Sequence, residues 1–380
     1  MNFLIAPDSF KGSLSATDAA QAIQTGLQVA LPTSHFTQLP MADGGEGTVA
    51  ALVTANQGQF IHTQATGPNG TPVNATYGLI DDQRTAVIEV AAASGLTLSQ
   101  LPYTPLTATS RGTGELIVDA LDRGVETIII GLGGSATNDG GAGLLQALGV
   151  HLWDRHHSEL AAGGVALREL VKIDADNIDP RLRHTTLIIA SDVTNPLVGT
   201  NGASAVFGPQ KGADKAMVRQ LDANLTHFGT LIGQLVGHDV LQLPGGGAAG
   251  GIGMALLAMT SATMHAGTDI VLQANHFSDY AVNADFVITG EGQIDFQTKF
   301  GKTPYGVAQA AKQANPTTTV LALAGNVGSG IDSLYDAIDA AFPIIPGVCT
   351  LPEAIDQAGP NLMRTATNLG RLIARSQSQR

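Results

Sequence analysis

The sequence has little cysteine, few charged residues and fewer basic than acidic side chains. Its single cysteine, Cys349, cannot form an intrachain disulfide, so a reducing compartment and a cytoplasmic location are expected. Charged residues make up 13% of the 380 residues, which is about half of the usual share in soluble domains. Because 19 basic residues stand against 32 acidic ones, the formal net charge is -13, which argues against nucleic acid as the main partner.

The sequence predicts neither a membrane span nor a targeting segment. The N-terminus has no basic stretch and only a short apolar run before Asp8, so we expect no signal peptide. The most apolar long segment, residues 240–264, is interrupted near its start by glycine and proline. Such a segment is typical of a glycine loop followed by a buried helix, and a membrane is not an expected partner.

Short aliphatic runs alternate with longer segments of helical period, which is typical of an α/β fold with a largely parallel sheet. The first helical segment starts near Ser15 and ends at Pro32, and further helices are expected at 304–314 and from about Leu334. Five strands are expected near the two ends of the chain, at residues 3–6, 35–39, 286–289, 320–324 and 342–345.

The simplest assembly places both ends of the chain in one flavodoxin-like parallel-sheet domain, residues 1–60 and 286–380. Residues 61–285 then form a second, mixed α/β domain inserted into a loop of the first, and the active site is expected in the cleft between the two. Within the insertion, the segment from Gly67 to Gly70 predicts the turn of a hairpin. Buried strands are expected at 86–90, 127–130 and 187–190.

Charged side chains follow three of the terminal strands, where ligands bind in an open parallel sheet. The first strand is followed by Asp8, Ser9 and Lys11, the second by Asp43 and Glu46, and the third by Glu291 and Lys302. Carboxylates and ammonium groups at one sheet edge are expected where Mg²⁺ and phosphate are held together. For any one of these residues, ordinary loop polarity or helix capping is an equal alternative.

A glycine-rich segment from Gly131 to Gly143 directly follows one of the inserted strands. Its residues Gly133, Gly134, Ser135 and Asn138 are candidates for contact with nucleotide phosphates, because glycines let backbone amides face an anion. It is not a Walker loop, and its partial match to a dinucleotide fingerprint is interrupted by Asn138-Asp139-Gly140-Gly141. A tight turn required for domain packing is the alternative interpretation.

Four further side chains are candidates, each with a simpler alternative. Arg111 is placed to clamp a carboxylate or phosphate, and a surface ion pair is the alternative. Asp192 and Asn195 follow a buried strand, so Asp192 is a candidate base or metal ligand, or part of a turn before proline. Lys211 is a candidate to add positive charge to the same cleft, and an exposed lysine without a specific role is the alternative. A third glycine run, 244–253, is a second anion site or a place of close packing.

Several of these segments together resemble the bacterial type I glycerate kinases, also called glycerate 2-kinases. The resemblance covers nearly the whole chain and rests on Ala6-Pro-Asp-Ser-Phe-Lys-Gly12, Met41-Ala-Asp-Gly-Gly-Glu-Gly-Thr48, Gly131 to Gly143, Ser191-Asp-Val-Thr-Asn-Pro196 and Thr289-Gly-Glu-Gly-Gln-Ile-Asp295. It implies a cytoplasmic enzyme that uses ATP with Mg²⁺ to phosphorylate D-glycerate, and 2-phosphoglycerate is the favoured product.

Given that reaction, the candidates divide by role. We expect Asp192 to take the hydroxyl proton, Lys11 and Lys302 to stabilise the transferred phosphoryl group, and Mg²⁺ to be held by Asp43, Glu46 and Glu291. Glycerate is expected to contact Asp8, Ser9, Arg111 and Asn195, and the nucleotide phosphates Gly133, Gly134, Ser135, Asn138 and Lys211. A kinase for a tetronate and a non-catalytic nucleotide or small-anion sensor are the alternatives, and several carboxylate-bearing loops favour catalysis over a sensor.

Overall fold

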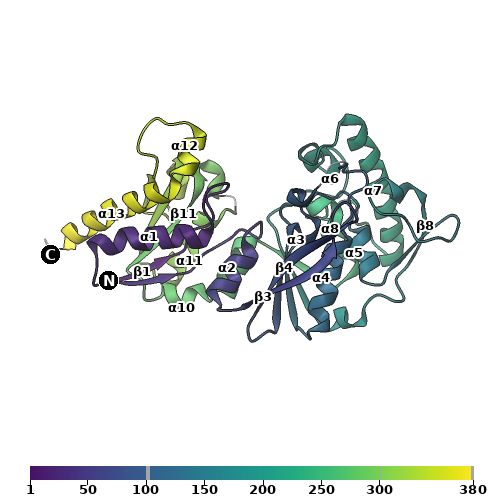
Figure 1. The fold of residues 1–380 in the computed structure, drawn as a ribbon, viewed down its shortest axis with the longest axis horizontal. Coiled ribbons are helices and arrows are strands. Elements are labelled where there is room, and N and C mark those ends of the chain that lie inside the picture. Colours follow the sequence, from purple (N-terminus) through teal and green to yellow (C-terminus); the bar gives the residue numbers. More distant parts are fainter. Residues whose placement is uncertain (100–102, 300, 378–380) are drawn as a thin grey trace. The chain divides into compact units, whose positions relative to one another are not determined.

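The computed structural model describes residues 1–99, 103–299 and 301–377, which form two compact units. The first unit contains Met1–Asp43, Ala50–Gln57 and the chain from Ala266 onward, and the second contains Gly44–Val49 and Gly58–His265. Each unit has its own sheet. Both sheets and the helices around them are visible in Figure 1.

The first unit is built on a five-stranded parallel sheet. Its order is β13 (Ala340–Pro343), β12 (Thr319–Val327), β11 (Phe286–Ile294), β1 (Asn2–Ile5) and β2 (His35–Gln38). Numbered along the chain within this unit, the strands run 2-1-3-4-5, which is the flavodoxin-like order and confirms the predicted fold class. In this order the strand connections change direction between β1 and β11, the place where ligands bind in such sheets.

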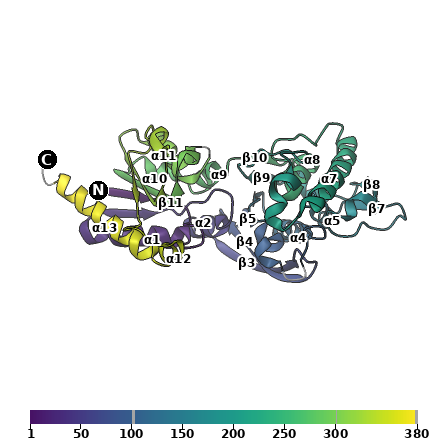
Figure 2. The same cartoon turned by 90° about the horizontal axis from the view of Figure 1, so that it is seen from above.

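Helices cover both faces of this sheet, because alternate residues of its buried strands are apolar toward each side. α1 (Ala16–Ala30) and α13 (Ala358–Gln377) pack side by side over Phe3, Ile5 and Ile288. α10 (Phe277–Ala281) and α11 (Thr303–Ala314) lie on the opposite side of β11, as Figure 2 shows. The Ser15 side chain accepts a hydrogen bond from the Asp18 amide and so caps the start of α1, as its position in the sequence indicates.

Three expectations for this unit differ from the structure. Leu334 ends a short 3₁₀ turn, Ile331–Leu334, so the helix expected from it is wrong, and the helices lie at α12 (Leu351–Asp356) and α13. β11 runs on to Ile294, so Glu291 lies inside the strand. The first unit resumes at Ala266 where residue 286 was expected, because α9 (Gly267–Ala274) and α10 pack on α11.

The second unit contains a six-stranded mixed sheet. Its order is β10 (Thr263–His265), β9 (Thr186–Ala190), β6 (Thr127–Gly131), β5 (Thr85–Glu89), β4 (Pro72–Ile80) and β3 (Gln59–Thr66). The four strands from β10 to β5 are parallel, and β3 and β4 form the predicted antiparallel hairpin. The turn of the hairpin is closed by a hydrogen bond from the Gly67 amide to the Thr71 carbonyl (2.7 Å).

Helices and a small hairpin complete this unit. They are α2 (Thr48–Ala55, whose first two residues belong here), α3 (Ala91–Ser94), α4 (Arg111–Asp122), α5 (Ala142–Ala147), β7 (His151–Asp154), β8 (Leu170–Asp174), α6 (Ala203–Phe207), α7 (Lys215–Val236) and α8 (Ile252–Met259). Apart from α2, these elements pack with the β-branched side chains of the central strands into one core. None of the helices that the structure describes is long and apolar enough to span a membrane.

Candidate active site

In the first unit, two carboxylates, one buried and one half-buried, lie at the carboxyl ends of the neighbouring strands β1 and β11. Asp8 directly follows β1, and its amide donates to the carbonyl of Gly290 on β11 (2.8 Å). The Asp8 carboxylate is 9% exposed and accepts hydrogen bonds from the Thr303 hydroxyl (2.5 Å) and the Ser9 amide (2.5 Å). Glu291, on the neighbouring strand, accepts a hydrogen bond from Thr298 (3.3 Å). The strand register therefore brings both acids to the ligand-binding edge of the sheet.

These acids hold their protons more tightly than isolated carboxyl groups do. The pKa of Asp8 is raised to about 6, mainly by burial and in smaller part by the nearby charge of Asp43. Burial raises the pKa of Glu291 to about 7, where the Lys302 ammonium acts in the opposite direction and the Asp8 charge adds to the increase. Asp8 thus lies within electrostatic reach of both Asp43 and Glu291, and a cation beside these carboxylates would relieve the repulsion.

The predicted cations of this unit lie at the same sheet edge. Lys302 occupies the cap position before α11, and its ammonium is 3.4 Å from Glu291 Oε1 and 3.3 Å from the Gln293 carbonyl. Lys11 is exposed, and its amide lies 3.6 Å from where a Cβ on Gly292 would be. The structure therefore brings Asp8, Ser9, Lys11, Glu291 and Lys302 together, and these residues come from the segments after two of the three strands that the sequence singled out.

In the second unit, the turn after Asp43 packs onto the glycine loop that follows β6. A Cβ on Gly131 would lie 2.5 Å from the Gly44 carbonyl oxygen, and one on Gly133 would lie 2.8 Å from the Gly45 Cα. These contacts leave no space for a side chain, so glycine is required at both positions of the loop.

Glu46 lies near a second acid that the sequence did not single out. Glu89, the last residue of β5, accepts hydrogen bonds from the amides of Gly47 (3.1 Å) and Val49 (2.8 Å). Burial raises the pKa of Glu89 above its ordinary value, and the Glu46 charge raises it further. The position of Glu89 at the end of a parallel strand is the signal that could have identified it.

The glycine loop is a backbone turn with its carbonyl groups tied to the protein. The amide of Leu96 donates to the Gly134 carbonyl (2.9 Å), and the Tyr103 hydroxyl donates to the Ala136 carbonyl (2.7 Å). Gly134 is exposed and has a φ of 71°, which favours glycine. The exposed turn at Gly133 and Gly134 is therefore available to a ligand.

The third glycine run packs directly against this loop. The Gly140 amide donates to the Gly250 carbonyl (2.9 Å), and a Cβ on Gly250 would lie 2.0 Å from the Thr137 carbonyl oxygen. Of the two interpretations of this run, close backbone packing is the one that these contacts support. Its contact partner is the first glycine loop.

Beneath the loop lie charged side chains that are almost fully buried. Lys211 is 2% exposed, and its ammonium donates to the Ser135 hydroxyl (2.8 Å) and the Thr137 carbonyl (2.6 Å). Asn138 is also buried and donates to the Ser204 hydroxyl (2.7 Å). Buried Asp139, which the sequence did not single out, completes the group. Lys211 was expected to add its charge to an open cleft, but it contacts the loop from the protein interior.

Asp192 and Asn195 belong to the loop after β9. Asp192 is exposed, and the preceding Ser191 amide donates to the His265 carbonyl (3.1 Å) at the end of β10. The Asn195 side chain donates to the Asn201 carbonyl (2.8 Å), and its own carbonyl accepts a hydrogen bond from Gly247 (2.9 Å). Asn195 therefore holds the loop, and Asp192 is the more accessible of the two.

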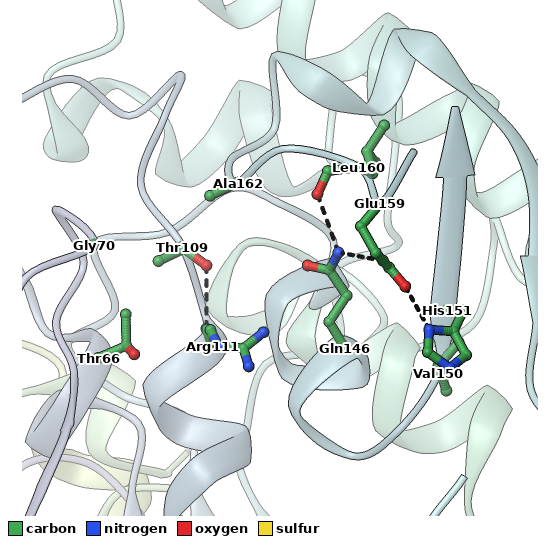
Figure 3. A pocket seen from close by; sticks show the side chains of 10 residues that line it. All are labelled: Thr66, Gly70, Thr109, Arg111, Gln146, Val150, His151, Glu159, Leu160 and Ala162. Atoms are coloured by element: carbon green, nitrogen blue, oxygen red, sulfur yellow. Dashed lines mark hydrogen bonds and ion pairs between the residues drawn. The ribbon is translucent and has the colours of Figure 1, made fainter. Parts of the chain in front are cut away.

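Arg111 lies at the start of α4 and lines a pocket of about 630 Å³. Its guanidinium pairs with Glu115 (3.0 Å), one turn along the helix, and the side chain is 48% exposed. The ion pair given as the alternative from the sequence is thus present. Figure 3 shows the other lining side chains, among them Gln146 and a contacting pair formed by His151 and Glu159. Arg111 is the lining residue that the sequence had singled out.

Within the part of the chain that the structure describes, no group of three or more His, Cys, Asp or Glu residues is placed to hold a metal ion by itself. Asp43 belongs to the first unit and Glu46 to the second, so two of the three predicted metal ligands fall in different units.

Comparisons with known proteins agree over the full length of the chain. A sequence profile of the Glycerate kinase family matches residues 3–374. A "Glycerate kinase" of Haemophilus influenzae is 50% identical over 376 residues, which cover 98% of this chain and 99% of the relative. A "Glycerate 2-kinase" of Escherichia coli K12 is 47% identical, and the match covers 98% of this chain and 98% of the relative. A crystal structure of a proposed glycerate kinase 2 from Salmonella typhimurium LT2 is 49% identical with a TM-score of 0.89, and the match covers 100% of this chain and 99% of that one.

The α/β fold and the matches define an enzyme of the kinase class. The chain belongs to the glycerate kinase family.

Proposed function

We propose that the protein transfers the γ-phosphoryl group of ATP to a hydroxyl group of D-glycerate, giving ADP and phosphoglycerate, with 2-phosphoglycerate as the favoured product. The observation that carries this proposal is the pair of buried Asp8 and half-buried Glu291 beside Lys302, at the carboxyl ends of the strands of a flavodoxin-like sheet. The family match and the relative named as a glycerate 2-kinase support the acceptor and the position of phosphorylation. The lone Cys349 supports a cytoplasmic location.

Mg²⁺ fits the residues of the first unit. Magnesium in kinases is commonly bound by one or two carboxylates together with substrate phosphates and water, so a complete protein cage is not needed. Asp43 and Glu291 would hold the ion, and Glu46 is the further candidate from the second unit. Burial is the main cause of the raised pKa values of Asp8 and Glu291, and repulsion between these two carboxylates adds to it, which favours a bound cation beside them. The ion would neutralise the charge of the phosphates when it is bound.

The chain's own residues then perform the acid–base and charge-stabilising steps. The glycerate hydroxyl oxygen forms a bond to the γ-phosphorus while the bond from that phosphorus to ADP breaks, and ADP keeps the electron pair. The Asp192 carboxylate takes the proton of the hydroxyl group. Lys11 and Lys302 stabilise the negative charge of the transferred group.

The remaining roles concern substrate binding. Arg111 binds the glycerate carboxylate, because a guanidinium recognises a carboxylate through two parallel hydrogen bonds. The other glycerate contacts are assigned to Asp8, Ser9 and Asn195. The exposed turn of Gly133 and Gly134, with Ser135, binds the nucleotide phosphates through backbone amides. Asn138 and Lys211 were expected to contact the same phosphates, but both are buried, so the role proposed for them is to support the loop.

A coupled ADP-release assay tests this proposal with a set of acceptors. D-glycerate is expected to give the highest kcat/KM, and omission of Mg²⁺ is expected to abolish turnover. L-glycerate, tetronates and lactate serve as controls for stereochemistry, chain length and the second hydroxyl group. A higher kcat/KM with a tetronate than with glycerate would show that the tetronate is the preferred substrate. Nucleotide binding without ADP release with any acceptor would favour the sensor alternative.

A further inference from the structure

Two opposite charges are buried on the inner side of the glycine loop. Lys211 ends a 3₁₀ turn, Pro209–Lys211, and is 2% exposed, while Asp139 is fully buried within the loop itself. Removing either charge from water is unfavourable, and apolar side chains of similar size are often equally stable at such places. A contribution to fold stability is therefore a weak explanation for burying Lys211 and Asp139 at this place, and a role in shaping the loop is the alternative.

Lys211 fixes the orientation of one peptide group. Its ammonium donates to the Thr137 carbonyl (2.6 Å) and to the Ser135 hydroxyl (2.8 Å). In a trans peptide the carbonyl and the following amide point in opposite directions. A carbonyl held toward the buried ammonium therefore directs the Asn138 amide the other way, and the same ammonium determines the rotamer of Ser135.

Asp139 ties the far end of the loop to the start of α4. Its carboxylate accepts hydrogen bonds from the amide (2.9 Å) and hydroxyl (2.8 Å) of Ser110. It also accepts hydrogen bonds from the amides of Gly141 (3.1 Å) and Gly143 (3.3 Å). Among the described residues, Asp139 is also the charged group that acts electrostatically on Lys211. The two side chains thus hold the middle and the far end of one loop and partly compensate each other's charge.

We propose that Lys211 and Asp139 are positioning residues that hold the Gly131–Gly143 loop in the conformation that binds the phosphates of ATP. The inference rests on the proposed function, because it takes this loop to be the nucleotide site. Neither side chain contacts the substrate in this account. Lys211 acts through Ser135 and Thr137, and Asp139 acts through Ser110 and the loop amides.

The protonation of Lys211 makes the proposed role visible in the pH dependence of ATP binding. Burial lowers the pKa of Lys211 to about 7, against the charge of Asp139, which raises it. The ammonium is therefore expected to lose its proton as the pH rises from 6 to 8.5, and its hold on Thr137 and Ser135 weakens. A guanidinium at this position stays charged throughout that range.

The test measures the Kd for ATP by calorimetry and the KM values by ADP release, using the full-length chain from pH 6 to 8.5. Lys211→Met is expected to raise the Kd for ATP about tenfold, with the glycerate KM within about twofold of the wild type. Lys172→Met is the matched control, because Lys172 is an exposed lysine of the same unit paired with Asp174. It is expected to leave both values unchanged.

The pH dependence of ATP binding by Lys211→Arg distinguishes the proposed role from a purely structural one. The titration of ATP itself affects both proteins equally and is first subtracted. The Kd of the wild type for ATP is then expected to rise with pH, whereas the Kd of the Arg variant is expected to stay constant. An identical pH dependence in both proteins would overturn the proposal. An unchanged Kd for ATP in a folded Lys211→Met variant would also overturn it. If the Met variant does not fold, Ser135→Ala takes its place, and an unchanged Kd for ATP in that variant would overturn the proposal.

The two proposals fail in different ways. If the wild-type chain binds ATP but does not phosphorylate glycerate, the proposed function is wrong and the calorimetric comparison still decides the role of Lys211. If the wild-type chain binds no ATP, both are overturned.

Discussion

Replacing Asp8 by asparagine should stabilise the first unit while it impairs the enzyme. The folded chain raises the pKa of Asp8 from 3.8 to about 6. At about 1.4 kcal/mol for each pKa unit, the ionised carboxylate disfavours folding at pH 7 by about 3 kcal/mol. Asparagine removes the charge but weakens the hydrogen bonds from Ser9 and Thr303, at a cost of about 1 kcal/mol. The net expectation is a gain of about 2 kcal/mol.

The sign of the pH dependence follows from the same shift. A carboxyl group with a raised pKa binds more protons in the folded chain than in the unfolded chain, so folding is most favourable when the group is protonated. The stability contributed by Asp8 is therefore lost as the pH rises from about 4 to 6, and Glu291 extends the loss toward pH 7. Asp8→Asn should remove the first part of this decrease.

Hydrogen exchange measured by mass spectrometry is the suitable assay, because it reports the free energy of opening for peptides from β1 and β11 separately from the second unit. The measurement is made with EDTA present, since a bound cation would compensate the charges. Asp82→Asn, a change at an exposed turn, is the control and should alter stability by less than about 0.5 kcal/mol. A lower opening free energy in Asp8→Asn than in the wild type at pH 7 would refute the reasoning.

Three further substitutions test individual residues. Asp192→Asn should lower kcat by several orders of magnitude with little change in the Kd for ATP, and near-normal turnover would remove Asp192 from the role of base. Arg111→Ala should raise the glycerate KM, whereas Arg123→Ala, which breaks a similar ion pair on the same helix, should not. An equal effect of the two arginine variants would place Arg111 outside the acceptor site. Gly133→Ala should lower the melting temperature because its Cβ would lie 2.8 Å from the Gly45 Cα, and an unchanged melting temperature would show that the loop can move aside.

Aliphatic runs made six of the described strands predictable, namely β1, β5, β6, β9, β11 and β12. The β3–β4 hairpin followed from the turn at Gly67, and the flavodoxin-like order places Asp8 and Glu291 on neighbouring strands. α13 was missed because Gly359 and Pro360 stand within its first turn and read as a loop. Proline is tolerated in the first turn of a helix, which explains how the helix forms there.

The support of the glycine loop could not be predicted from the sequence. Lys211 contacts Ser135 across 76 positions of the chain, and Asp139 contacts Ser110 across 29. A lysine next to glycine and proline is usually exposed, and only the packing of distant segments buries this one. The charged residues at the strand ends could be predicted because their position right after a strand is visible in the sequence. Contacts between residues far apart in the chain can be found only in the tertiary structure.

Phosphorus NMR of the reaction product tests the central claim most directly. The purified chain is incubated with ATP, Mg²⁺ and D-glycerate, and the phosphomonoester formed is assigned by its coupling to the glycerate protons. The account predicts one new resonance coupled to the single proton at C2, together with an equal amount of ADP. A resonance coupled to the two protons at C3 would contradict the favoured product, and ATP that stays intact beside unreacted D-glycerate would contradict the claim that this chain is a glycerate kinase.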